Sequence, residues 1–75
     1  MSTDTVLEQI FKDMITLGDP IDPTADREQY ENWDSLANMN LMMAINGEFG
    51  DIITLDDLDN FRSFAVIEKM VQDRA

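Results

Sequence analysis

The segment Glu31-Asn32-Trp33-Asp34-Ser35-Leu36 contains the side chain with the clearest chemical use, the hydroxyl of Ser35. An apolar, helix-forming stretch follows it directly, which predicts that Ser35 lies at a helix N-terminus. Backbone N–H groups and the positive helix end stabilise an anion there, so a phosphate ester on this hydroxyl would be well placed. A plainer interpretation is that Ser35 only caps the helix, and the segment taken alone favours it.

Most other catalytic groups are missing from the chain. Its 75 residues include no cysteine and no histidine, so the usual ligands of zinc, haem and iron–sulfur clusters are absent. The cysteine nucleophile and the Ser–His pair are absent for the same reason. Acidic residues are plentiful, but the pattern sets no pair of them into an apolar pocket. We therefore expect that the protein is not an enzyme.

Four aspartates lie close together in the sequence, at Asp51, Asp56, Asp57 and Asp59. Carboxylates of this kind can bind Ca²⁺ or Mg²⁺ weakly, but their spacing does not match an EF-hand loop. A solvated helix start, in which negative charge complements the helix dipole, is the better interpretation. We expect no metal site.

The charge balance limits the partners. Sixteen acidic and five basic residues give a net charge of −11, which disfavours nucleic acid and anionic membranes and favours basic protein surfaces. The longest apolar run, Leu41 to Ile45, is far too short to span a membrane, and the N-terminus lacks the basic start of a signal peptide. We expect a monomer in the cytoplasm without membrane insertion.

Apolar residues recur at helical spacing along most of the chain, which predicts an all-α fold. The length allows one domain, residues 1–75. We expect a small four-helix bundle in which three helices are longer, the third is short and the first loop is long. The predicted helices cover residues 5–17, 35–49, 55–60 and 63–73.

The first helix is predicted to bury a stripe that includes Leu17 and to end at Gly18 in the left-handed conformation. Thr5 with Glu8 fits a capping box at its start, and Thr3 and Asp4 are alternative caps. The loop over residues 18–33 is long for a compact domain. Three of its side chains are expected to anchor it to the core: Ile21, Tyr30 and Trp33.

The later helices have recognisable caps. Asp34 or Ser35 is predicted to cap the second helix, which is apolar nearly all round and is therefore expected to be central or to present an apolar face. Thr54 is the predicted cap of the short helix, which carries the apolar Leu55 and Leu58. Ser63 is the predicted cap of the last helix. That helix should bury Phe64, Val66, Ile67, Met70 and Val71, while Lys69 and Arg74 complement its dipole.

Asp34-Ser35-Leu36 at the start of the second helix, after a helix and a long loop, resembles the acyl carrier proteins. The similarity continues through Glu48-Phe49-Gly50, through residues 54–58 (Thr-Leu-Asp-Asp-Leu) and through Arg62-Ser63 before the last helix. It covers essentially the whole chain. The tripeptide alone is a weak signal, but together with length, acidity and helix order it is fairly specific.

The resemblance implies that Ser35 is the attachment site of 4′-phosphopantetheine, with Asp34 in a supporting role at the helix start. A separate phosphopantetheinyl transferase would deliver this arm from coenzyme A, and the thiol of the arm would hold the cargo as a thioester. The reactive sulfur would then belong to the cofactor, in agreement with a chain that has no cysteine. The remaining implied partners are enzymes that load and transfer acyl groups.

Leu36, Met39 and Met43 are candidate contacts for a partner enzyme or for the acyl group. Leu36 follows the attachment point directly, and Met39 and Met43 share a helix face, with Met42 beside Met39. Flexible thioethers suit an expandable pocket or a partner surface. Core packing is the alternative for all of them.

One departure from the family lies in the second helix, which there usually bears acidic residues toward partner enzymes. The corresponding positions here are Ala37, Asn40, Asn46 and Gly47, and only Glu48 keeps a charge. Charged residues at the rim of a protein–protein interface mainly set the rate at which the partners associate and the specificity of the interaction. We therefore expect a specialised carrier for a dedicated lipid, polyketide or other secondary pathway, with docking that is more apolar than usual.

Two alternative functions stay open. An aminoacyl, D-alanyl or peptidyl carrier would use the same arm, although peptidyl carriers usually have Gly-Gly-His before the serine, where this chain has Asn32-Trp33-Asp34. An interaction module would keep the bundle without ever receiving the arm. Whether Ser35 becomes modified separates the interaction module from both kinds of carrier.

Overall fold

The computed structural model of the protein describes residues 3–75. Three α-helices form its frame: α1 (Thr3–Phe11), α2 (Ser35–Phe49) and α3 (Phe64–Arg74). Three short helical segments complete it: the π-helix η1 (Lys12–Thr16) and the 3-10 helices η2 (Arg27–Gln29) and η3 (Leu55–Asn60). The described residues include no β-strand, so the all-α prediction is confirmed.

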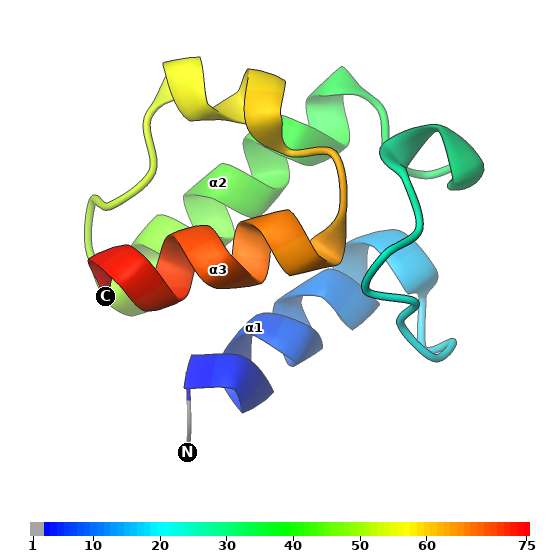
Figure 1. Ribbon diagram of the computed structural model, residues 1–75, viewed down its shortest axis with the longest axis horizontal. Coiled ribbons are helices and arrows are strands. Elements are labelled where there is room, and N and C mark those ends of the chain that lie inside the picture. Colours follow the sequence, from blue (N-terminus) through cyan, green and yellow to red (C-terminus); the bar gives the residue numbers. More distant parts are fainter. Residues whose placement is uncertain (1–2) are drawn as a thin grey trace.

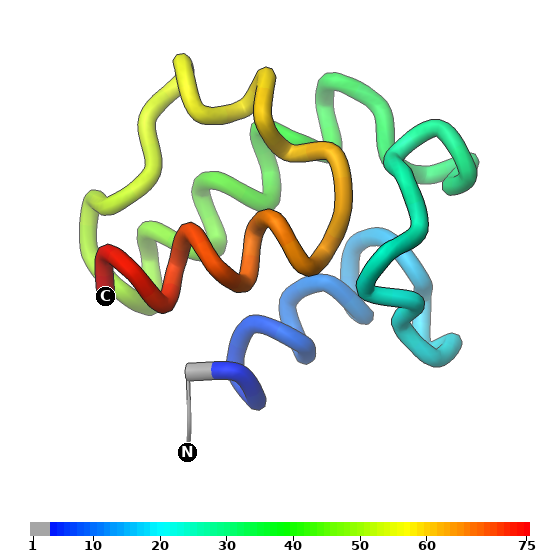
Figure 2. Tube along the Cα trace, in the orientation of Figure 1, coloured from blue at the N-terminus to red at the C-terminus, as the bar shows by residue number. Residues whose placement is uncertain are grey.

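The helices pack around one another in a short bundle. α1 contacts both α2 and α3, and η3 lies against α2 (Figure 1). The loop between η1 and α2 lies at one end of the bundle, where the chain doubles back before it enters α2 (Figure 2). The Cα radius of gyration is 11.0 Å, close to the ~11 Å expected for a compact domain of this length.

Phe11 is the centre of the aromatic core. It is buried between Trp33 and Phe64, and each of these rings meets it edge-on at 5.1 Å between centroids. Tyr30 makes a similar contact with Phe11 at 5.9 Å. Offset and edge-to-face ring pairs stabilise a core beyond the area that they bury. Ring contacts therefore hold the long loop and α3 against α1.

The first helix differs from its prediction at both ends. α1 begins at Thr3, so Thr3, Asp4 and Thr5 lie inside the helix and the capping position falls outside the described residues. From Lys12 the backbone continues as the π-helix η1 and ends at Leu17, which adopts the left-handed conformation with φ 51°. Leu17 is 66% exposed, so its predicted place in the core was wrong. The chain turns one residue before Gly18, although Gly18 also has a positive φ of 97°.

The long loop is held in place by side chains that pack on the core and by backbone hydrogen bonds. Trp33 is buried, and Tyr30 and Ile21 pack on the core as predicted. The backbone N–H of Arg27 donates to the carbonyl of Arg62 at 2.6 Å, and that of Ala65 donates to the carbonyl of Pro23 at 2.9 Å. The loop is therefore fixed to the start of α3.

One predicted core residue of the C-terminal third, Val66, lies outside the core. Val66 is 40% exposed, and Leu55 of η3 is 61% exposed. Phe64, Ile67 and Val71 are buried, and Met70 packs on the core as predicted. Ser63 caps α3 by accepting a hydrogen bond from the N–H of Val66 at 3.3 Å.

Candidate functional site

The start of α2 is organised by Asp34, not by Ser35. Asp34 is the residue before the helix, and its carboxylate accepts the N–H of Ala37 at 2.8 Å. Ser35 is the first helical residue, and its exposed side chain makes no hydrogen bond within residues 3–75. The interpretation of Ser35 as a cap was therefore wrong. Because Asp34 satisfies the helix end, the Ser35 hydroxyl stays available for chemistry.

A buried amide lies directly beneath this helix start. Asn38 is 3% exposed; its carbonyl oxygen accepts the indole N–H of Trp33, and its amide donates to the carbonyl of Leu58 at 3.3 Å. The three residues belong to the loop, to α2 and to η3. Asn38 therefore fixes the first turn of α2 relative to the two segments that flank Ser35.

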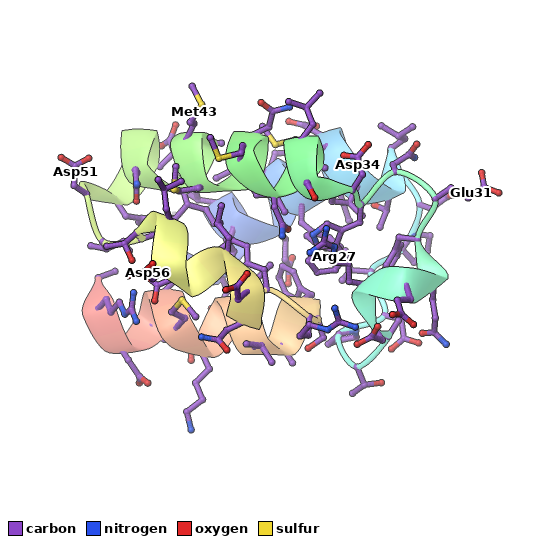
Figure 3. The ribbon with its side chains drawn as sticks, turned by 90° about the horizontal axis from the view of Figure 1, so that it is seen from above. Arg27, Glu31, Asp34, Met43, Asp51 and Asp56 are labelled. Carbon is purple, nitrogen blue, oxygen red and sulfur yellow. The ribbon has the colours of Figure 1, made fainter. Side chains whose placement is uncertain are left out.

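Ser35 opens onto a hollow of about 270 Å³ between α2, η2 and η3. Its lining residues are Arg27, Ser35, Asn38, Met39, Leu55, Leu58 and Asp59. The lining combines apolar side chains with one cation and one carboxylate. Arg27 and Asp34 lie at the same end of α2 (Figure 3).

The predicted contact residues of α2 are exposed. Leu36 is 69% exposed, Met43 64% and Met39 39%, whereas Met42 is partly buried against the core. Core packing was therefore the wrong alternative for Leu36, Met39 and Met43. Met39 lines the hollow beside Ser35, while Met43 lies on a different one, so the two methionines serve separate surfaces.

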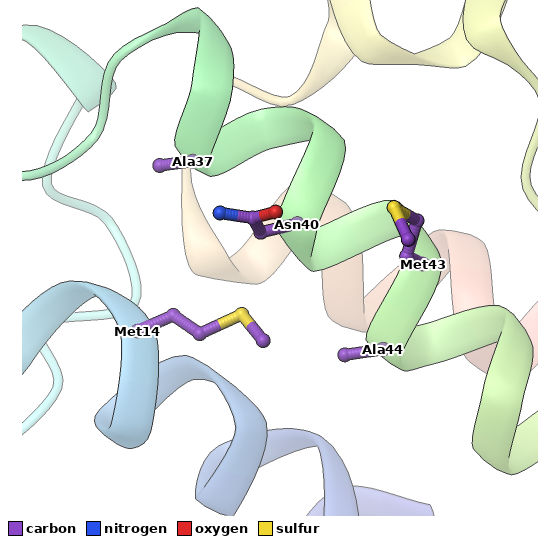
Figure 4. A pocket seen from close by; sticks show the side chains of 5 residues that line it. All are labelled: Met14, Ala37, Asn40, Met43 and Ala44. Carbon is purple, nitrogen blue, oxygen red and sulfur yellow. The ribbon is translucent and has the colours of Figure 1, made fainter.

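This second hollow lies between η1 and α2 and measures about 470 Å³. Figure 4 shows its five lining side chains, with Met14 facing α2 from the neighbouring helix. The others come from α2: Ala37, Asn40, Met43 and Ala44. None of the five is charged. This apolar groove and the hollow at Ser35 share no lining residue.

Two of the four uncharged α2 positions, Ala37 and Asn46, have roles in packing or in holding the backbone. Ala37 is buried. The Asn46 side chain donates to the carbonyl of Ile53 at 2.9 Å and accepts its N–H at 3.0 Å, which holds the chain that follows α2. The absence of acidic residues at these two positions therefore reflects packing, and only Asn40 and Gly47 are exposed.

The acidic cluster is partly used for structure. Asp57 accepts the N–H of Thr54 at 2.8 Å and pairs with both terminal nitrogens of Arg74 at 2.7 and 3.1 Å. The hydrogen bonds from Arg74 and then Thr54 hold the pKa of Asp57 well below its usual value. Asp51, Asp56 and Asp59 are exposed, as predicted, but Asp57 is an ion-pair partner rather than a solvated charge. The described residues contain no group of three or more side chains suited to a metal ion.

Glu68 on α3 has the opposite electrostatics. Burial raises the pKa of its carboxyl, and the negative charges of Asp4 and Glu8 raise it further. Burial and the neighbouring negative charges therefore disfavour the ionised form of Glu68. The carboxylates of Asp4, Glu8 and Glu68 belong to α1 and α3, and none of them lines the hollow at Ser35. They bear on stability rather than on the site.

Arg27 and Asn38 belong to the site but were not predicted from the sequence. Neither has a local pattern that marks it, because the partners of both come from other segments of the chain. An asparagine inside a strongly apolar helix was the available signal for Asn38, since a buried amide must find partners. Arg27 had no comparable signal.

Comparison of the chain with protein-family models, with curated proteins and with solved structures finds no match. No helix within residues 3–75 is long and apolar enough to cross a membrane.

Proposed function

We propose that the protein is a carrier whose Ser35 bears 4′-phosphopantetheine, with acyl groups as the cargo. The observation that supports this proposal most is the state of the Ser35 hydroxyl. It is exposed, it makes no hydrogen bond within the described chain, and it opens onto a hollow whose lining combines apolar and polar side chains. A hydroxyl hidden in the core could not be reached by a modifying enzyme.

The residues around Ser35 fit such an arm. Attachment forms a bond between the Ser35 oxygen and phosphorus while the bond from phosphorus to the nucleotide part of coenzyme A breaks, and the transferase takes up the hydroxyl proton. Asp34 keeps the helix start ordered during this step because its carboxylate caps α2. When bound, the arm supplies the thiol that forms the thioester.

The hollow gives the chain a surface against which an arm can rest. Met39, Leu55 and Leu58 provide apolar contacts beside Ser35, and the flexible Met39 adapts to groups of different shape. Leu36 and Met43 stay exposed on α2 for a partner enzyme. The uncharged character of this face agrees with a specialised carrier whose docking depends more on apolar contact than on charge.

The experiment is intact-mass analysis after incubation with coenzyme A, Mg²⁺ and a broad-specificity phosphopantetheinyl transferase. We expect the mass to increase by one arm in the wild type and not in Ser35→Ala. Ser63→Ala is the matched control, since it removes another helix-start serine and should still be loaded. An unchanged mass of the wild type, or loading of Ser35→Ala, would contradict the proposal.

An interaction module without the arm is the second candidate, and the apolar groove between η1 and α2 favours it. The groove lies outside the hollow at Ser35, so a partner could bind there whether or not Ser35 is modified. Failure of loading, together with binding of a partner that is weakened by Met43→Ser, would favour this candidate.

A further inference from the structure

Arg27 is the cation that lies nearest to the chemistry proposed for Ser35. The chain has only five basic residues: Lys12, Arg27, Arg62, Lys69 and Arg74. Of these, Arg27 alone lines the hollow that contains Ser35. It reaches the hollow from η2, on the side of the long loop (Figure 3).

Its side chain is fixed in place but keeps most of its donors free. The Nε–H of Arg27 donates to the carbonyl of Trp33 at 3.1 Å, and the backbone N–H of Arg27 is bound to Arg62. No hydrogen bond from its terminal nitrogens is made within residues 3–75. The side chain is only partly exposed, so the guanidinium is held near one position.

Unlike the other two arginines, Arg27 has no acidic partner within residues 3–75. Arg62 pairs with Asp26 at 2.9 Å, and Arg74 pairs with Asp57 at 2.7 Å. No carboxylate of the described residues lies within 4.0 Å of the Arg27 nitrogens. The two acids next to it in sequence, Asp26 and Glu28, both pair with Arg62, at 2.9 and 3.6 Å. A partly buried arginine without a counter-charge is suited to a negatively charged ligand.

We infer that Arg27 binds the phosphate of the group carried on Ser35. The inference rests on the proposed function and names the part of the chain that holds the first atoms of the arm. A guanidinium matches the spacing of two phosphate oxygens and can bind them through parallel hydrogen bonds. Asp34 precedes Ser35 in the chain and Asp59 lines the same hollow; both carboxylates repel a phosphate, so Arg27 is the lining residue that attracts it.

The contact would set the direction of the arm. A phosphate held by Arg27 at the mouth of the hollow directs the rest of the arm along Met39 and Leu55. Without the contact, the added negative charge would be repelled by a chain whose net charge is already −11. Arg27 is therefore a positioning residue for the carried group and takes no part in a reaction.

The test begins with the unmodified protein, so that it does not depend on enzymatic loading. Free 4′-phosphopantetheine and pantetheine, which lacks the phosphate, are titrated into ¹⁵N-labelled protein and followed by NMR. We expect the Nε–H of Arg27 and the amide of Ser35 to shift and saturate with the phosphorylated compound and to stay in place with pantetheine. Equal shifts with both compounds would overturn the inference.

Substitutions separate the charge from the fold. Arg27→Gln should weaken binding of free 4′-phosphopantetheine about fivefold, as expected for a partly exposed ion pair. Arg27→Lys keeps the charge but not the two parallel hydrogen bonds, so it should restore only part of the binding. Lys69→Gln removes the same charge from a residue that does not line the hollow and should bind like the wild type. Far-UV circular dichroism checks that each variant is folded. Binding by Arg27→Gln at the level of Lys69→Gln would overturn the inference.

The loaded protein distinguishes the inference from the proposed function. If Ser35 accepts the arm, the ³¹P resonance of the loaded protein should move between wild type and Arg27→Gln but not between wild type and Lys69→Gln. An identical resonance in all three proteins would reject the Arg27 contact while the carrier function stands. Absence of loading together with phosphate-dependent shifts in the free titration would reject the carrier function while the contact stands.

Discussion

Replacing Asn38 with alanine should destabilise the protein strongly, because this amide joins three segments around Ser35. Its carbonyl oxygen is the partner of the Trp33 indole N–H, and its amide group donates to Leu58. Both Asn38 and Trp33 are 3% exposed, so water cannot replace the lost group without opening the core. The carbonyl of Leu58 keeps a second donor, the N–H of Phe61.

The cost can be estimated from these contacts. A buried donor left without a partner costs about 1–3 kcal/mol, and the space left by the missing amide adds about 1 kcal/mol. The sum is about 3 kcal/mol, a large share of the roughly 4–11 kcal/mol expected for a domain of 75 residues. The melting temperature should fall by about 12–24 °C.

Urea unfolding followed by far-UV circular dichroism and by the fluorescence of Trp33 measures this change. Asn40→Ala is the matched control, because Asn40 lies on the same helix, is exposed and makes no hydrogen bond within the described chain. Asn38→Leu fills the space but leaves the Trp33 N–H unpaired, so it separates the cavity from the hydrogen bond. If Asn38→Ala and Asn40→Ala agreed within about 0.5 kcal/mol, the role given to Asn38 would be refuted.

Three further predictions concern stability. Asp34→Ala should cost about 1 kcal/mol in urea unfolding through loss of the α2 cap, and no loss would contradict the capping geometry. Thr16→Val should raise stability by about 1 kcal/mol, since the buried Thr16 hydroxyl has no hydrogen-bond partner; a loss would mean that the hydroxyl is satisfied. As the pH falls toward 4.5, the melting temperature should rise, because the folded state favours the protonated form of Glu68. Below pH 3.8 the melting temperature should fall, because the folded state favours the ionised form of Asp57. Glu68→Gln should remove part of the rise and Asp57→Asn part of the fall, and a curve unchanged in both variants would contradict these assignments.

The net charge of −11 gives one more prediction. Self-repulsion destabilises a compact acidic domain and salt screens it. Added sodium chloride should therefore raise the melting temperature, and a melting temperature that does not respond to ionic strength would contradict this expectation.

The parts of the fold that local sequence controls were predictable. α2 spans Ser35–Phe49, the predicted range, because an aspartate cap begins it and a glycine with positive φ ends it. η3 covers residues 55–60 as predicted, although it is a 3-10 helix. Thr54 and Asp57 form a capping box at its start. Caps act over three or four residues, so the sequence reveals them.

The features that depend on distant residues were not predictable. The π-helical end of the first helix and the exposure of Leu17, Leu55 and Val66 follow from which neighbours cover each face. Hydrophobic spacing shows which side chains share a face, but it does not show what packs on that face. Arg27 could not be predicted for the same reason, because its position in the hollow with Ser35 depends on backbone hydrogen bonds between the long loop and the start of α3.

The most direct test is the mass of the protein isolated from the cells that produce it, with tandem fragmentation to find any modified residue. The carrier account predicts 4′-phosphopantetheine on Ser35, with a thioester-bound group on part of the population that hydroxylamine removes. Protein that is entirely unmodified at Ser35, in cells whose other carriers bear the arm, would contradict the account.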